Sequence, residues 1–304
     1  MGTVSAANPE TLNEQLFYVT VRLEAQFPDG STSIGTGFFY DVPTEPDTNA
    51  TVIVTNKHVL AGASSLTVWF LKKNTDGGPA LGHVYPITIG AFNAGNYYGH
   101  PDPDIDVAVL PAVPLFQLAS DSGNPLFYRS IVSSSVPTLD QLNDLDAVED
   151  VRFIGYPDGI YDTENYLPVI RRGTTASYLQ HDYEGRPVFL IDASVFPGSS
   201  GSPVVIADSA SYATKSGLTL GGRLLLLGIV AEVRLTQRVG DLITLPTSTI
   251  VPRVSEMLDL GLVYKARTID ECVDALLTSN GLSRRGLSAA TEPTASEVAA
   301  SDPA

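Results

Sequence analysis

A short turn around Ser200 has the residue types of a nucleophile loop. Residues 196–205 read FPGSSGSPVV, so Ser200 stands between Gly198 and Gly201. Glycine permits the backbone conformations that such a tight turn needs. The amide groups of Gly198 and Ser200 can then point at one spot, where they would stabilise the oxyanion of a tetrahedral intermediate. An ordinary turn rich in glycine and serine is the alternative interpretation.

A serine nucleophile needs a base and an acid that orients the base. Among the four histidines, His58 follows an apolar strand in TVIVTNKHVLAGA, upstream of Ser200. Asp106 opens the apolar segment DVAVLP. A carboxylate there is costly to bury unless it is hydrogen-bonded, and an imidazole N–H would satisfy it. We therefore take His58, Asp106 and Ser200 as the candidate catalytic residues.

A metal or cofactor site is not predicted. The histidines His58, His83, His100 and His181 are scattered, and neither an HExxH motif nor paired cysteines occur. The serine chemistry above requires no cofactor.

The elements that must position these residues are short and apolar. Strand-length segments rich in β-branched and aromatic residues recur in two successive groups, separated by turn clusters such as Pro28-Asp29-Gly30. Two groups of about six strands predict an all-β fold of two packed six-stranded antiparallel β-barrels with a C-terminal helix. The expected parts are an N-terminal helical extension (1–16), a first β-barrel (17–114), a connection (115–148), a second β-barrel with the C-terminal helix (149–262), a short helical extension (263–285) and a disordered tail (286–304).

Helices are expected in three places. Residues 9–16 (PETLNEQL) predict a short N-terminal helix, residues 249–260 (TIVPRVSEMLDL) an amphipathic one, and residues 268–280 one more short helix. From about residue 286 the chain is rich in Ala, Ser, Thr, Pro and Glu, a composition that cannot bury a core.

The bulk composition restricts the partners and the compartment. The 304 residues carry a formal net charge of −16, which repels phosphate backbones and argues against nucleic-acid binding. Cys272 is the single cysteine, so no internal disulfide can form and a reducing compartment is favoured. The N-terminus lacks the pattern of a secretory signal, and LLLLGIVA (224–231) is too short to span a bilayer. We expect a cytoplasmic protein with no membrane partner.

The order His58, Asp106, Ser200 and the motifs around them resemble the trypsin/chymotrypsin-like serine peptidase family. TNKHVL, DVAVLP and GSSGSP resemble the three catalytic elements of that family, and the intervals are 48 and 94 residues. GTGFFY (35–40), FIGYP (153–157) and LLGIVAEV also match, so the resemblance covers roughly residues 15–260. It implies a chymotrypsin-like double barrel and a serine endopeptidase that cleaves protein or peptide substrates through an acyl-enzyme.

The resemblance also implies a substrate-binding wall and shows departures. The wall would include Ser194, Val195, Ala231, Glu232 and Val233, which favours a small or medium uncharged residue before the cut. Ser199 replaces the aspartate that receives the freed N-terminus in secreted zymogens, as in disulfide-free bacterial relatives. Ala231 replaces a serine that supports the buried aspartate. About 44 residues follow Leu260, too few for a PDZ domain, so a lone peptidase domain is expected.

Three rival interpretations remain to be weighed. One is a catalytically weak or inactive relative that serves as a peptide-binding scaffold. An α/β-hydrolase is excluded, because that fold places a histidine after the serine and none follows Ser200. The third is a regulated peptidase that stays inactive until an unknown partner binds or the chain is processed. Its candidate processing sites are the dibasic pairs Arg171-Arg172 and Arg284-Arg285.

Overall fold

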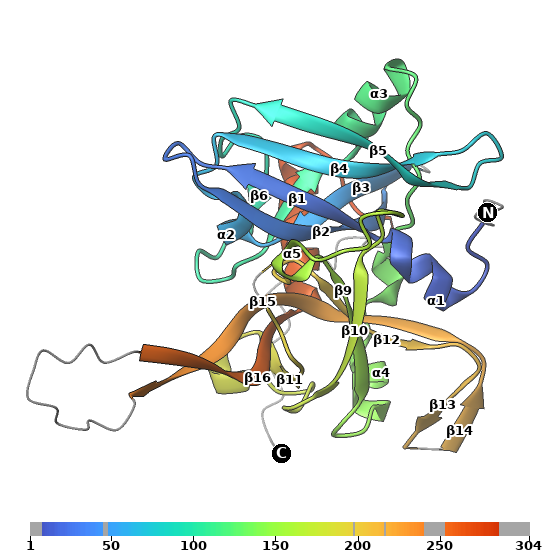
Figure 1. Ribbon diagram of the computed structural model, residues 1–304. Coiled ribbons are helices and arrows are strands. Elements are labelled where there is room, and N and C mark those ends of the chain that lie inside the picture. Colours follow the sequence, from blue (N-terminus) through green and yellow to red (C-terminus); the bar gives the residue numbers. More distant parts are fainter. Residues whose placement is uncertain (1–7, 45–47, 197, 216, 240–252, 286–304) are drawn as a thin grey trace, which may run out of the picture.

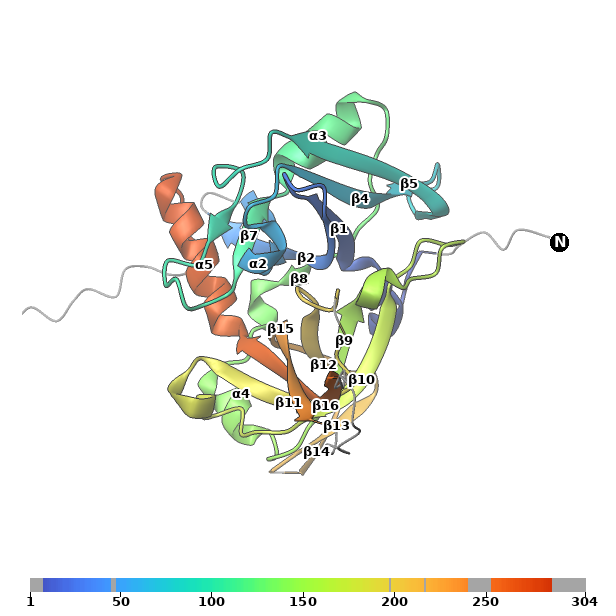
Figure 2. The same ribbon diagram turned by 60° about the vertical axis from the view of Figure 1, so that its left-hand side comes forward.

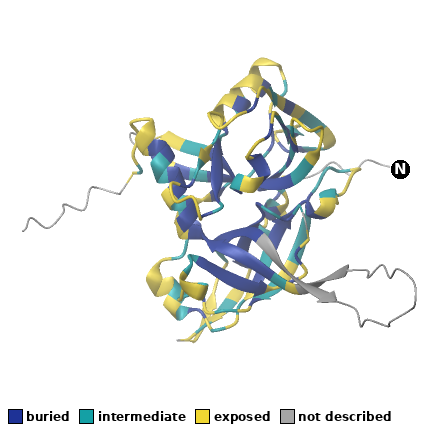
Figure 3. Ribbon diagram, turned by 90° about the vertical axis from the view of Figure 1, so that its left-hand side faces the viewer, coloured by how far each residue is buried: buried dark blue, intermediate teal, exposed yellow. Residues whose placement is uncertain are grey.

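The computed structural model describes residues 8–44, 48–196, 198–215, 217–239 and 253–285. Two β units lie one above the other, with helices at their periphery and along one side (Figures 1 and 2). Most of the buried residues lie in strands and in the C-terminal helix, and most of the exposed ones lie in connecting segments (Figure 3). The predicted all-β class is confirmed.

The first unit is an eight-stranded sheet with the order β5-β4-β1-β2-β3-β7-β6, in which β8 pairs in parallel with β2. Its strands are β1 (Thr20–Gln26), β2 (Thr32–Thr44), β3 (Thr48–Thr55), β4 (Ser65–Lys73), β5 (Pro79–Gly90), β6 (Tyr98–Gly99), β7 (Ala108–Pro111) and β8 (Ile131–Val132). The strand count differs from the six expected because two short strands, β6 and β8, join it from the flanking segments.

The second unit is the expected six-stranded antiparallel barrel, closed in the order β10-β11-β16-β15-β12-β9. Its strands are β9 (Asp150–Gly155), β10 (Val169–Thr175), β11 (Val188–Asp192), β12 (Pro203–Asp208), β15 (Arg223–Val239) and β16 (Arg253–Lys265). The hairpin β13 (Ser211–Thr214) and β14 (Gly217–Leu220) projects from it (Figure 1).

Helices of the chain are short except at the C-terminal end. They are α1 (Leu12–Gln15), α2 (Lys57–Leu60), α3 (Val113–Asp121), α4 (Leu139–Asp144) and α5 (Ala266–Ser279), with 3₁₀ turns η1 (Leu16–Tyr18), η2 (Ser133–Ser135), η3 (Pro157–Gly159) and η4 (Tyr183–Gly185). The connection expected at 115–148 therefore contains most of α3 and all of α4. None of the helices in the described part of the chain is long and apolar enough to cross a membrane.

Of the three predicted helices, two are present and one is a strand instead. The N-terminal one is a single turn, α1, closed by a capping box between Thr11 and Glu14. The prediction for 268–280 is confirmed by α5. The helix predicted at 249–260 is wrong: residues 253–260 belong to β16, and 249–252 lie outside the described residues, as does the tail predicted from 286. A short apolar pattern fits both the helical period and the strand period. The backbone pairing of β16 with β15 and β11 makes this segment a strand.

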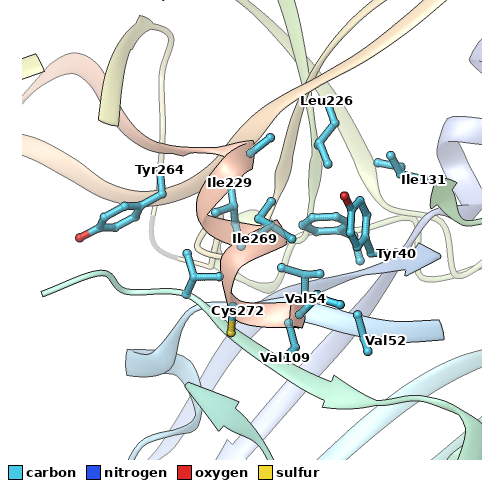
Figure 4. Close-up of a cluster of buried hydrophobic side chains, with 14 of the residues drawn as sticks. Tyr40, Val52, Val54, Val109, Ile131, Leu226, Ile229, Tyr264, Ile269 and Cys272 are labelled. Atoms are coloured by element: carbon cyan, nitrogen blue, oxygen red, sulfur yellow. The ribbon is translucent and has the colours of Figure 1, made fainter. Parts of the chain in front are cut away.

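Helix α5 joins the two units. It runs along one side of the molecule past both of them (Figure 2) and lies against β7 of the first and β15 and β16 of the second. Ile269 and Cys272 are fully buried in the same cluster as Val54 and Val109 of the first unit and Ile229 of the second (Figure 4). The two units thus share one apolar core, which restricts how far they can move apart.

Candidate active site

His58 and Asp106 form a tightly held pair in the first unit. His58 is the second residue of α2, whose N-cap Asn56 has an extended backbone and directly follows the end of β3 at Thr55. The His58 Nδ1 atom is 2.5 Å from Asp106 Oδ2, and the His58 backbone N–H donates to Asp106 Oδ1 at 3.0 Å. The carboxylate therefore accepts from the ring at Nδ1, which leaves Nε2 as the free base nitrogen.

The loop that carries Asp106 is held from several sides. Asn56 Nδ2 donates to the Asp106 carbonyl at 2.6 Å, and Lys57 Nζ donates to the Asp102 carbonyl at 2.7 Å. From α5, Glu271 contacts the buried His100 ring, with 2.9 Å between Oε2 and Nε2. These contacts fix the acid relative to His58, whose side chain is 49% exposed and so open to a substrate, whereas that of Asp106 is 20% exposed.

The nucleophile loop depends on two glycines in the left-handed region. Gly198 has φ +81° and Gly201 has φ +90°. A Cβ at Gly201 would lie 1.8 Å from the Thr36 carbonyl oxygen, and one at Gly198 would lie 2.6 Å from the Tyr156 carbonyl oxygen. Both positions therefore exclude any larger residue, both by conformation and by space.

Thr36, on β2 of the first unit, holds this loop. Its N–H donates to the Ser200 carbonyl at 2.9 Å, and its hydroxyl donates to the Gly198 carbonyl at 3.1 Å. The same hydroxyl accepts from the Tyr156 N–H at 3.1 Å. Sequence reasoning missed Thr36 because a threonine in a strand gives no signal of such a role.

His58 and Ser200 line one cavity of about 370 Å³ between the two units, together with Gly198. Ser200 Oγ donates to the Ala231 carbonyl at 3.2 Å, its one hydrogen bond among the described residues. The Gly198 and Ser200 N–H groups have no acceptor in the described part of the chain. A base, a hydroxyl and two free amides thus meet at one opening.

A comparison with known protein families gives a match for this chain. The family model for the trypsin-like peptidase domain matches residues 35–210, more than half of the chain. The chain belongs to the trypsin-like peptidase family. The match contains GTGFFY, the helix α2 with His58, the loop with Asp106 and the loop with Ser200.

Solved structures show low similarity to this trypsin-like peptidase domain. The Rv3671c protease from M. tuberculosis in its active form is 18% identical, with 90% of this chain and 89% of that chain covered and a TM-score of 0.41. Deg5 is 20% identical, with 72% and 81% covered and a TM-score of 0.41. The inactivated scabies mite protease paralogue S-I1 is 14% identical, with 87% and 97% covered and a TM-score of 0.40. A search of curated proteins gives no match.

Ser199 lies in a buried polar site of the trypsin-like domain. It is 0% exposed, and its hydroxyl accepts from Arg171 Nη2 at 2.5 Å. Arg171 comes from β10, donates through Nη1 to the Ser194 carbonyl at 2.7 Å, and lies over the ring of Phe153. Burial lowers the pKa of Arg171 to about 10, against the opposing effect of the Asp158 charge. An arginine of the same chain therefore contacts Ser199, the residue that the resemblance aligns with the N-terminus-binding aspartate of secreted zymogens.

The expected substrate-binding residues separate into different environments. Ser194 is exposed and its hydroxyl donates to Asp259 Oδ1 at 2.9 Å, whereas Val195 is buried in the core of the second barrel. Ala231 is buried and offers its carbonyl to Ser200. The side chains of Glu232 and Val233 lie outside the described part of the chain.

One arginine of each dibasic pair is held by the fold, whereas Arg172 and Arg285 are exposed. Arg171 donates to Ser199 and to the Ser194 carbonyl. Arg284 donates to Asp270 Oδ1 at 2.6 Å and also to Asp274, and its side chain is 11% exposed.

Among the described residues, no cluster of His, Cys, Asp and Glu is arranged to hold a metal ion.

Proposed function

We propose that this domain is a serine endopeptidase that cleaves protein or peptide substrates, with His58, Asp106 and Ser200 as its catalytic residues. The observation that carries the proposal is the His58–Asp106 pair at 2.5 Å, opening into the same cavity as Ser200 and two unpartnered amides. Membership of the trypsin-like peptidase family supports it.

The reaction begins when the Ser200 hydroxyl turns from the Ala231 carbonyl to His58 Nε2, a change of one staggered side-chain torsion. Ser200 Oγ attacks the peptide carbonyl while His58 takes the hydroxyl proton. The resulting oxyanion accepts hydrogen bonds from the Gly198 and Ser200 N–H groups. Hydrogen bonds in substrate-free sites are commonly long and shorten in the complex.

Collapse of the intermediate breaks the C–N bond, and His58 delivers its proton to the leaving nitrogen. Water then attacks the acyl-enzyme with His58 again as base, which releases the acid product and restores the Ser200 hydroxyl. Asp106 holds the tautomer and stabilises the imidazolium throughout. In triads of this kind, exchanging the acid for asparagine lowers kcat by about 10⁴-fold because the tautomer is wrong.

Labelling with a fluorophosphonate probe and cleavage of a peptide library test the proposal. Wild type and a Ser209→Ala control, which removes an exposed serine in the β12–β13 turn, should be labelled and should cleave. Ser200→Ala and His58→Ala should do neither. A folded wild type that is not labelled at any pH from about 6 to 9 would contradict the proposal and favour a peptide-binding scaffold.

We further propose a cytoplasmic location. Cys272 is free and buried in the structure, which is compatible with a reducing compartment. Cell fractionation followed by detection of the native chain tests this, and recovery from the secreted or membrane fraction would contradict it.

A further inference from the structure

The cavity beside Ser200 contains an acidic group that the reaction does not use. Its described lining residues come from the start of β2, from α2, from η3 and from the nucleophile loop: Thr32, Ser33, Ile34, His58, Val59, Asp158, Gly198 and Ser200. Its ionisable members are His58 and Asp158. With a volume of about 370 Å³ it has room for side chains of a bound peptide.

One wall of this cavity is an unpaired strand edge. Thr36 directs its N–H away from β1, to Ser200, whereas Phe39 N–H donates to Val19 and the Ser31 carbonyl accepts from Phe27, on the β1 side. Because backbone groups alternate along an antiparallel strand, Ile34 points the same way as Thr36. Since β3 pairs with β2 only over Phe38–Thr44, the Ile34 N–H and C=O are left for another strand.

This edge lies on the leaving-group side of the scissile bond. His58 must deliver its proton to the leaving nitrogen, so the segment after the cut passes the imidazole and the residues beside it. The segment before the cut is expected along β15, and none of the described lining residues of this cavity belongs to β15. An extended peptide can add to the Ile34 edge, as in other cases of strand addition.

Asp158 lines the same cavity in an uncommon backbone conformation. It is exposed, has φ +47°, and its backbone N would lie 2.9 Å from a Cβ placed on Gly198. A non-glycine residue in this region costs about 1–3 kcal/mol, and such strain clusters at functional sites. No hydrogen bond or ion pair of its carboxylate occurs among the described residues, although its charge raises the pKa of Arg171 against the effect of burial.

We propose that Asp158 selects a lysine or arginine side chain in the first two positions after the scissile bond. The inference rests on the proposed function, because it names the substrate class of that same site. An unpaired carboxylate beside the peptide edge favours a cation there, and a partly exposed ion pair of this kind changes kcat/KM by about two- to fivefold.

Quenched peptides that differ only in Lys, Gln or Glu after the cut test the proposal. Wild type and the control Asp140→Asn, an exposed aspartate on α4, should prefer Lys over Gln by about two- to fivefold. Asp158→Asn keeps the shape and tolerates the left-handed backbone, and should remove the preference. Asp158→Lys should turn it toward Glu. A Lys-to-Gln ratio that is the same in wild type and Asp158→Asn would overturn the proposal.

A binding measurement separates this failure from failure of the proposed function. Calorimetry with Ser200→Ala and with Ser200→Ala/Asp158→Asn needs no turnover. The same Lys peptide should bind more tightly than its Gln analogue to the first variant and equally to the second. If wild type is inactive but this difference in binding appears, the catalytic proposal fails and the selectivity stands; equal binding to the first variant refutes the selectivity.

Discussion

The exchange Thr36→Val tests whether one hydroxyl joins the first unit to the nucleophile loop. Thr36 is 0% exposed, and valine preserves its shape and its backbone bonds. What is lost is the acceptor for the Tyr156 N–H and the donor to the Gly198 carbonyl, both at 3.1 Å. The control Thr36→Ser retains the hydroxyl and removes one buried methyl.

The expected magnitude follows from these two contacts. Each buried polar group left without a partner costs about 1–3 kcal/mol, and a gained apolar methyl offsets about 0.8 kcal/mol. Thr36→Val should therefore lower the free energy of unfolding by about 1–5 kcal/mol. Thr36→Ser should lower it by about 1 kcal/mol, the value of one buried methyl with little cavity.

Reactivity should fall as well, because the Gly198 carbonyl and the Ser199 N–H form the peptide group that lies between the two oxyanion donors, the Gly198 and Ser200 N–H groups, and so helps to fix the turn that aims them. Loss of one such donor costs about 2.7–4 kcal/mol in the transition state, so the labelling rate should fall by up to about 10²–10³-fold. Urea unfolding and fluorophosphonate labelling of folded protein measure the two effects. Thr36→Val with the stability and labelling rate of Thr36→Ser would refute the reasoning.

Three further predictions concern buried or charged side chains outside the catalytic residues. Arg171→Met should slow fluorophosphonate labelling, since it removes the donors to Ser199 and to the Ser194 carbonyl; a labelling rate equal to wild type would show that the loop holds its shape without the arginine. Cys272 is 0% exposed and burial raises the pKa of its thiol to about 12, so iodoacetamide should modify it at pH 8 only after unfolding; modification of native protein at the rate of a free thiol would contradict the buried position. Hydrogen bonding from Arg267 is the largest cause that lowers the pKa of Asp182 below 3.8, so its stabilising effect is present above that value and is lost as the pH falls through the lowered pKa. Wild type should thus be more stable than Asp182→Asn at pH 7 in urea unfolding, with the difference declining below about pH 4; a difference constant from pH 7 to 2 would argue against the ion pair.

Much of the fold class could be predicted from the sequence. Each strand-length segment is itself rich in β-branched and aromatic residues, and turn residues separate one segment from the next. The three candidate catalytic residues could also be predicted from the sequence, since a serine between glycines, a histidine after a strand and an aspartate before one are local patterns. The helix predicted at 249–260 failed because its apolar spacing fits two periods, and backbone pairing with distant strands chose between them.

The sequence by itself determined which chemistry the chain can carry: residue types for a base, an acid and a nucleophile, with Gly198 and Gly201 where the turn requires positive φ. Only the tertiary structure decided what holds and surrounds them. The Arg171 guanidinium lies 28 residues from Ser199 along the chain, and the Asp158 carboxylate and the Thr36 hydroxyl lie 42 and 164 residues from Ser200. Such contacts depend on how strands pair across two units, and local sequence contains no record of that pairing.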